Sequence, residues 1–235
     1  MKNCLIVASV LVVASFIPAR AATYFDPLGD GALVGVGGGI LDISSVEVNN
    51  TATDLIFKIN LAGDPTATDW GKYMVGIDSA PGGDPAGNAW GRPIGMSLGM
   101  DYWLGSWADS GNGLEVRNWT GAAWNLQSAT YGPNIGAQSF SKDASSVTLS
   151  VNFAALGLSI GNSIMVDVYT SGGGGTDGAI DALSNPGQTI ANWGDSYNSG
   201  GLVSPYTLTA VPEPATLAFL GLGGAALLVH AFRRR

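Results

Sequence analysis

The sequence predicts an all-β fold, a single antiparallel and jelly-roll-like β-sandwich, in the centre of a 235-residue chain. Short apolar stretches alternate with polar residues at a period of two, which is typical of strands with one buried face. Turns rich in Gly, Asn and Asp separate these stretches, and the chain contains 35 glycines. Because no central segment shows helical periodicity, an antiparallel sandwich is favoured over a parallel α/β sheet.

The N-terminus has the three parts of a signal peptide. Lys2 precedes an apolar stretch over residues 4–17, and Ala19 and Ala21 are small residues at positions −3 and −1 of a cleavage site. We expect cleavage after Ala21 or one residue later. The alternative is an uncleaved anchor, which is disfavoured because the apolar stretch is short for a membrane span.

The central strands can be placed by their alternation. The clearest covers residues 54–61, where Leu55 and Phe57 share one face while Lys58 and Asn60 share the other. Further strands are expected at residues 42–48, 72–78, 94–104, 113–119, 123–129, 146–153, 163–170 and 202–208. One helical turn is expected at residues 154–158. No repeat of 20 to 50 residues is visible, which disfavours solenoids and propellers.

The C-terminus consists of a Pro-Glu-Pro motif, an apolar span and a basic end. These parts are formed by Pro212, Glu213 and Pro214, by residues 215–232, and by Arg233, Arg234 and Arg235. A helix with a rise of 1.5 Å per residue over this span is just long enough to cross the hydrocarbon core. Three terminal cations resist translocation, so we expect a transmembrane helix with the preceding domain outside.

This tail resembles that of the PEP-CTERM family of exported proteins. The resemblance implies processing by an exosortase-type membrane enzyme in a Gram-negative bacterium that makes extracellular polysaccharide. The tail would then hold the protein at the inner membrane only transiently before it reaches the cell surface or extracellular matrix. The alternative is an ordinary single-pass anchor with a proline-bearing stalk. The expected domains are residues 1–21, 22–210 and 211–235.

The composition of the exported domain excludes several classes of function. Residues 22–211 contain 17 acidic and five basic side chains, so the domain should repel nucleic acid. The only cysteine, Cys4, lies in the leader and the only histidine, His230, in the apolar span. Thiol nucleophiles, serine–histidine triads and histidine-ligated metals are therefore excluded there. We do not expect an enzyme; a carboxylate-based glycan hydrolase that uses Glu115 is the remaining alternative.

Tryptophan is the most informative residue type, with seven in the exported domain. An indole ring can stack on the C–H face of a sugar while nearby polar groups bind its hydroxyls. Period two in the strand at residues 101–107 puts three side chains on one face, and a nearby loop adds an indole and a guanidinium. The candidate sugar-binding residues are Trp90, Arg92, Asp101, Trp103 and Trp107. For any single tryptophan, a position in the core is the alternative.

One acidic segment is a candidate calcium loop. Asp26 and Asp30 lie four residues apart in an Asp-Pro-Leu-Gly-Asp-Gly sequence whose glycines can expose carbonyl oxygens. Oxygen ligands of this kind suit Ca²⁺, although the spacing is not that of an EF-hand. A plain turn stabilised by its aspartates is the alternative. We expect no other cofactor.

A second resemblance concerns the central domain. It is carried by Asp-Pro-x-Gly-Asp at residues 26–30, the apolar patterns at residues 41–48, 55–59 and 73–78, and Trp90-Gly91-Arg92. This order is similar to family 9 carbohydrate-binding modules and their DOMON-like relatives. The resemblance implies a β-sandwich with a sugar site of aromatic side chains. No catalytic domain accompanies it, and the histidine of the haem-binding relatives is absent.

The sequence therefore predicts an exported surface or matrix protein whose non-catalytic β-sandwich binds extracellular polysaccharide. Two other hypotheses remain open. One is a structural matrix or surface-layer component without a defined sugar site. The other is the glycan hydrolase named above.

Overall fold

The computed structural model describes residues 21–96, 99–109, 111–185, 190–198 and 205–211. The predicted signal peptide (apart from Ala21), the Pro-Glu-Pro motif, the apolar span with its expected transmembrane helix, and the terminal arginines lie outside these residues. Within the described ranges, no helix is both long and apolar enough to cross a membrane. The β-structure belongs to one compact unit, Ala19–Ala210.

The first sheet has five strands, all antiparallel. Their spatial order is β1 (Ala22–Phe25), β2 (Ile43–Asn50), β3 (Asp54–Leu61), β10 (Ser146–Asn152) and β9 (Gln138–Lys142). In β3, Leu55, Phe57 and Ile59 are fully buried and alternate with half-buried neighbours. This is the one-sided burial that the alternation of the sequence predicts.

The second sheet has seven antiparallel strands. Its order is β12 (Asp181–Ala182), β11 (Ser163–Ser171), β4 (Lys72–Asp78), β6 (Tyr102–Trp107), β7 (Gly113–Trp119) and β8 (Trp124–Ala129), with β14 (Tyr206–Thr207) also paired to β11. A short parallel pair joins β5 (Ile94–Gly95) to β13 (Tyr197–Asn198). The helical content among the described residues is two short 3₁₀ turns, η1 (Gly132–Asn134) and η2 (Phe153–Leu156).

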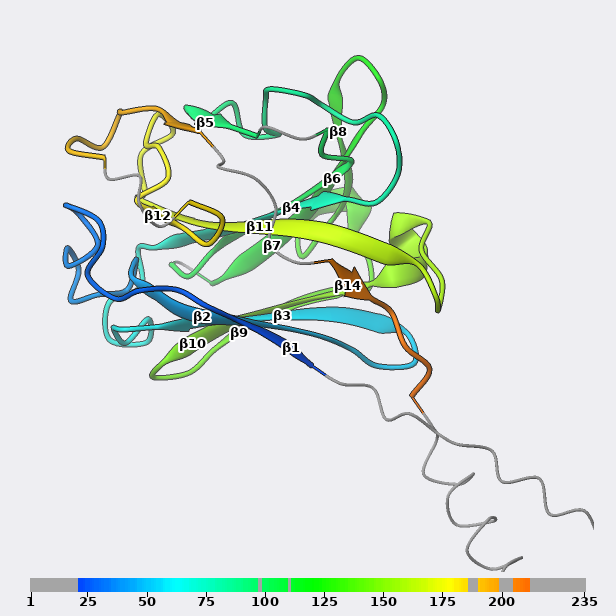
Figure 1. Ribbon diagram of the computed structural model, residues 1–235, viewed down its shortest axis with the longest axis horizontal. Helices are drawn as coiled ribbons and strands as arrows, with labels where there is room; N and C mark the ends of the chain where they lie inside the picture. Colours follow the sequence, from blue (N-terminus) through cyan, green and yellow to red (C-terminus); the bar gives the residue numbers. More distant parts are fainter. Residues whose placement is uncertain (1–20, 97–98, 110, 186–189, 199–204, 212–235) are drawn as a thin grey trace, which may run out of the picture. The chain divides into compact units, whose positions relative to one another are not determined.

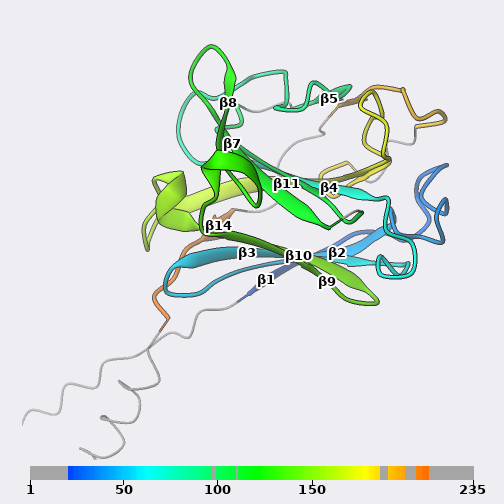
Figure 2. The same ribbon diagram turned by 180° about the vertical axis from the view of Figure 1, so that it is seen from behind.

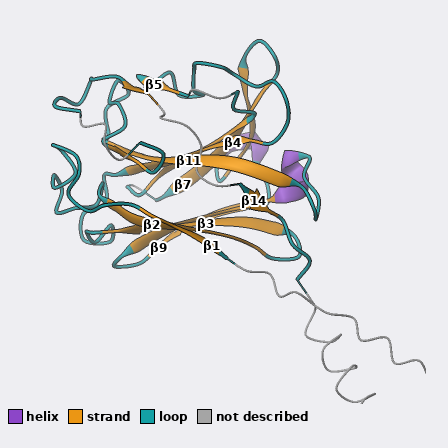
Figure 3. Cartoon of the chain, in the orientation of Figure 1, coloured by secondary structure: helices purple, strands orange, loops and turns teal. Residues whose placement is uncertain are grey.

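The two large sheets form separate layers, and the main core lies between them (Figures 1 and 2). This core draws on both sheets: Phe57 and Leu149 come from the first, and Val75, Leu104 and Val166 from the second. Strands and loops make up nearly all of the described chain (Figure 3). The expected all-β class with antiparallel sheets is therefore confirmed, and the layering is that of a β-sandwich.

The outer face of the seven-stranded sheet is not open to solvent over its whole length. Loops that include β5 cover part of this face (Figure 1) and enclose a second apolar cluster with Met74, Trp103 and Tyr169. These loops decide which aromatic side chains on this face are accessible from solvent.

Several predicted strands need correction. The expectation of one strand over residues 94–104 is wrong, because β5 ends at Gly95 and β6 begins at Tyr102. The methionines Met96 and Met100 lie between them and approach Gly76 on the outer face of β4. No strand was predicted at β1 or β9, whose exposed positions dilute the apolar alternation, or at the two-residue strands β12 and β13.

Candidate functional site

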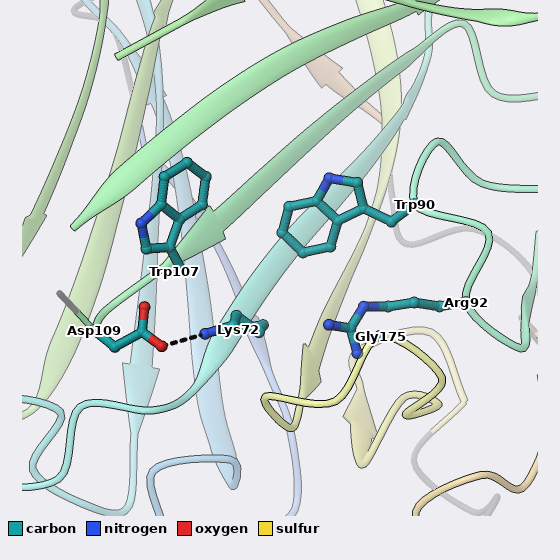
Figure 4. A pocket seen from close by; sticks show the side chains of 6 residues that line it. All are labelled: Lys72, Trp90, Arg92, Trp107, Asp109 and Gly175. Atoms are coloured by element: carbon teal, nitrogen blue, oxygen red, sulfur yellow. Dashed lines mark hydrogen bonds and ion pairs between the residues drawn. The ribbon is translucent and has the colours of Figure 1, made fainter. Parts of the chain in front are cut away.

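A groove lies on the outer face of the seven-stranded sheet, beside the covering loops. It encloses about 380 Å³ and is lined by Lys72, Trp90, Arg92, Trp107, Asp109 and Gly175. Figure 4 shows the two indoles on either side of the groove and the side chains of Lys72 and Arg92 reaching toward its centre. Trp90, Arg92 and Trp107 were predicted as site residues, whereas Lys72, Asp109 and Gly175 were not.

Two glycines make room for the indoles. A Cβ atom at Gly105 in β6 would overlap the ring of Trp90, and one at Gly113 in β7 would overlap the ring of Trp107. Each indole therefore lies against a bare stretch of sheet backbone. Because a side chain at either position would displace the ring, these glycines set the shape of the groove.

A hydrogen bond to Glu115 fixes the position of the Trp90 indole. This carboxylate is only 3% exposed, and its Oε1 accepts hydrogen bonds from Nε1 of Trp90 and, at 2.8 Å, from Nε of Arg117. Its Oε2 accepts from the Tyr131 hydroxyl at 2.7 Å. Burial alone would raise the pKa of Glu115, but the bonds from Arg117, Trp90 and Tyr131 lower that pKa below its usual value. Glu115 is therefore an ionised structural acceptor.

Arg92 is held in the wall of the groove. Its Nη1 donates to Ser171 Oγ at 2.7 Å and to the backbone carbonyl of Asp177 at 3.0 Å. The guanidinium carbon lies 5.4 Å from the centre of the Trp90 ring, within the range of a cation–π contact. Burial lowers the pKa of Arg92, which nonetheless stays charged at neutral pH.

Lys72 and Asp109 provide a polar pair on the other side of the groove. The Lys72 ammonium donates to Asp109 Oδ2 at 2.8 Å and to the Trp70 carbonyl at 3.3 Å. The groove thus combines two apolar ring faces with cationic donors and one carboxylate acceptor.

Trp103 and Asp101 do not belong to this groove. Trp103 shares its face of β6 with Trp107, as predicted, but it is fully buried, with its ring stacked 5.9 Å from that of Tyr169. The prediction that Trp103 contacts a ligand is therefore wrong, because the covering loops leave its ring no free face. Asp101 is bound to the loop that follows β4: its Oδ2 accepts from the backbone amides of Ser79 and Ala80, at 2.8 and 2.9 Å.

A second hollow lies beyond the glycine-rich loop at residues 172–175. It encloses about 440 Å³ and is lined by Trp70, Gly173, Gly174, Asp177 and Trp193. The rings of Trp70 and Trp193 meet edge to face with their centres 5.9 Å apart. Since the loop also supplies Gly175 to the groove, it borders both hollows. Only the number of tryptophans in the sequence hinted at this hollow, because the residues come from distant segments.

The candidate calcium residues lie in a cluster of three carboxylates. Oxygens of Asp26, Asp30 and Asp181 lie within 4.8 Å of one another. Asp26 and Asp181 are 7% and 6% exposed. Burial, followed by the charge of a neighbouring aspartate, raises the pKa of both. The sequence placed Asp26 and Asp30 together but gave no sign of Asp181.

The sorting residues of the tail lie outside the described residues, and here the comparison with known families is informative. Residues 210–235 match the PEP-CTERM protein-sorting motif. No curated protein and no solved structure matches the chain significantly, so the resemblance to carbohydrate-binding and DOMON-like modules is not confirmed. The chain thus carries a PEP-CTERM sorting signal, which implies recognition by an exosortase and export to the cell envelope or surface of a Gram-negative bacterium.

Proposed function

We propose that this exported protein is a non-catalytic, polysaccharide-binding β-sandwich of the cell surface or extracellular matrix. The observation that carries the proposal is the pair of indoles, Trp90 and Trp107, on either side of one groove with charged side chains between them. In this proposal the sorting tail delivers the domain to the compartment where the polysaccharide is found.

The chemistry of the groove suits a sugar chain. Each indole offers an apolar ring to the C–H face of a pyranose. Arg92 and Lys72 are hydrogen-bond donors, and Asp109 is an acceptor, so hydroxyl groups or a sugar carboxylate would find partners. The rings are already held in place by Glu115 and by the bare backbone at Gly113, which reduces the entropy lost on binding.

The arrangement of carboxylates favours binding over hydrolysis. Glycosidases need two carboxyl groups on opposite sides of the scissile bond, one of them able to donate a proton. The residues that line the groove include one carboxylate, Asp109, which is paired with Lys72. Glu115 accepts a hydrogen bond from the Trp90 indole, and its pKa is lowered. It would therefore be a poor proton donor near neutral pH.

Affinity electrophoresis of the exported protein through gels that contain neutral or acidic polysaccharides tests this proposal. We expect at least one polysaccharide to retard the wild type. Trp107→Ala should lower the affinity derived from that retardation at least tenfold, since burial of a large apolar side chain contributes about 1.5–3 kcal/mol. Trp119→Ala is the matched control, because Trp119 packs against Trp124 in a hairpin away from the groove. Equal retardation of both variants, or no retardation of the wild type on any polysaccharide, would count against a sugar site.

The structural-matrix hypothesis makes a different forecast for the same samples. A matrix or surface-layer component would assemble as its concentration rises, without selectivity for sugars. Analytical ultracentrifugation of the wild type and of Trp107→Ala distinguishes the two, because the proposed sugar site requires no self-assembly.

A further inference from the structure

We propose that Asp26, Asp30 and Asp181 bind one Ca²⁺ ion, which joins the loop after β1 to strand β12 of the other sheet. This inference is independent of the sugar groove and uses different residues. The loop after β1 and β12 lie at the same end of the two layers in both views (Figures 1 and 2).

The spacing of the carboxylates fits a cation between them. Calcium–oxygen distances are about 2.3–2.6 Å, so two ligands of one ion lie up to about 5 Å apart. The ligand oxygens of the three aspartates all lie within 4.8 Å of one another. One ion can therefore contact all three at the same time.

Two of the three carboxylates, Asp26 and Asp30, lack the partners that buried charges need. Among the described residues, no donor outside the cluster bonds to either oxygen of Asp26, which is 93% buried, or to the buried oxygens of Asp30. None of the ion pairs found among the described residues involves the three aspartates. Buried carboxylates without donors or cations are strongly unfavourable. A bound cation would satisfy them, whereas a plain turn stabilised by aspartates would not leave these oxygens free.

Asp181 is already oriented toward the other two. Its Oδ2 accepts from the backbone amide of Ile43 at 2.6 Å, and its Oδ1 accepts from that of Ala182 at 2.8 Å. Asp42 restrains the loop in turn, because its carboxylate accepts from the backbone amide of Gly29 at 3.1 and 3.2 Å. Asp26 and Asp30 thus lie in a loop that Asp42 restrains, and Asp181 meets them from β12.

The ligand type selects the metal. Oxygen-only carboxylate sites prefer hard cations, since zinc and copper favour the nitrogen and sulfur ligands that this cluster lacks. Magnesium requires near-ideal octahedral geometry and usually keeps several waters, whereas Ca²⁺ accepts irregular arrangements of several carboxylates. Calcium is therefore the cation that the cluster fits best.

The proposed ion would stabilise the folded domain after export. Asp26 and Asp181 come from distant parts of the sequence, so only the folded chain brings them together, and an ion that binds only the folded state shifts the unfolding equilibrium. Extracellular calcium modules typically bind with dissociation constants of about 10⁻⁴–10⁻³ M. We therefore infer that the domain reaches its full stability outside the cytoplasm.

The test is a calcium titration of the exported protein after treatment with EGTA, followed by thermal unfolding and by calorimetry. We expect one ion per chain and a melting temperature that rises by about 5–10 °C when calcium exceeds its dissociation constant 100-fold. Asp30→Asn, at a half-buried position, and Asp26→Asn should each lose most of this rise. Without calcium, Asp26→Asn should melt at or above the wild-type temperature, because it removes repulsion among the carboxylates.

Asp69→Asn is the control, since this exposed acid lies outside the cluster and its removal changes the net charge equally. It should retain the full calcium response. The proposal is overturned if the wild type shows no shift and no binding heat in 10 mM calcium, if Asp26→Asn and Asp30→Asn keep the response, or if magnesium produces the same shift at the same concentration.

Discussion

Glu115 shows how one buried charge can organise an aromatic surface. Its carboxylate accepts hydrogen bonds from Trp90, Arg117 and Tyr131, so a groove residue and two neighbouring side chains depend on it. Charge-assisted bonds of this kind are stronger than neutral ones, and each loses strength when the acceptor becomes neutral. The residue that resembled a catalytic acid in the sequence has a structural role in the fold.

Replacing Glu115 by Gln should destabilise the protein by about 2 kcal/mol at pH 7, because the charged acceptor of these bonds is lost. The folded-state pKa of Glu115 is lowered, so the advantage of the wild type is complete above the ordinary glutamate pKa. It should shrink as the pH falls through the lowered value. Urea unfolding of both proteins at pH 7 and at pH 3 measures the difference, and a difference that is the same at both pH values would contradict this account.

Strands β6 and β7 form the floor of the groove, where two glycines without side chains leave space for the indoles. Gly105 lies opposite Glu115 across the two strands, and Gly113 lies opposite Trp107. On this face the strands present backbone where the indoles need space, and on the other face Leu104 and Val116 enter the main core. The same two strands thus serve the core and the groove.

Gly113→Ala should force the Trp107 ring away from the sheet and reduce retention on a bound polysaccharide. Overpacking at such a position costs about 1–3 kcal/mol. Tryptophan fluorescence and affinity electrophoresis measure the two effects. Gly35→Ala is a matched control, because a Cβ atom at Gly35 meets no other atom within 4 Å. If Gly113→Ala bound and unfolded like the control, the proposed packing of Trp107 would be wrong.

The last described strand, β14, pairs with β11 and is also bonded to one side chain of β2. Asn50 is 2% exposed. Its Oδ1 accepts from the Tyr206 hydroxyl at 2.7 Å and from the Thr209 amide at 3.0 Å. Its Nδ2 donates to the Thr209 carbonyl at 2.8 Å. This anchor holds the chain just before the sorting signal begins.

Asn50→Ala should release this anchor and destabilise the domain by about 2–3 kcal/mol, since several buried polar groups lose their partner. Cleavage by a broad-specificity protease near residues 205–211 should become faster. Asn125→Ala, at an exposed position in β8, should leave both properties unchanged. Protection of residues 205–211 equal to that of the wild type would show that other contacts hold β14.

Along the chain, the strands begin directly after the predicted signal peptide and end directly before the sorting motif. Strand β1 starts at Ala22, directly after the predicted signal-peptide cleavage site. The matched sorting motif starts at residue 210, directly after the last contacts of Thr209 with Asn50. Cleavage after Ala21 and removal of the sorting motif would therefore leave every described strand intact.

Intact-mass analysis of the protein released by cells that express an exosortase should find a chain that starts at Ala22, or one residue later, and ends near Pro214. Glu213→Ala should leave the N-terminal cleavage unchanged and retain the tail, because it alters only the sorting motif. A wild-type product with both apolar ends would contradict export and processing.

Much of the fold could be predicted from the sequence because strand alternation is a local property. The bounds of β3, β4 and β7 agree with the predicted ranges, and Trp119 and Trp124 pair across the turn between β7 and β8. The tail could also be identified without a structure, since its three parts are contiguous. Residue type and spacing also selected Trp90, Arg92 and Trp107, and these three residues line one groove.

The remaining features depend on contacts between distant segments. The alternation of side chains along a strand assigned Trp103 and Trp107 to one face of β6. It could not show that loops bury Trp103 and leave Trp107 beside a groove. It also could not place Asp181 next to Asp26, because their contact exists only after the two sheets pack together. Local periodicity reports which way a side chain points, whereas its surroundings depend on which distant parts of the chain fold against it.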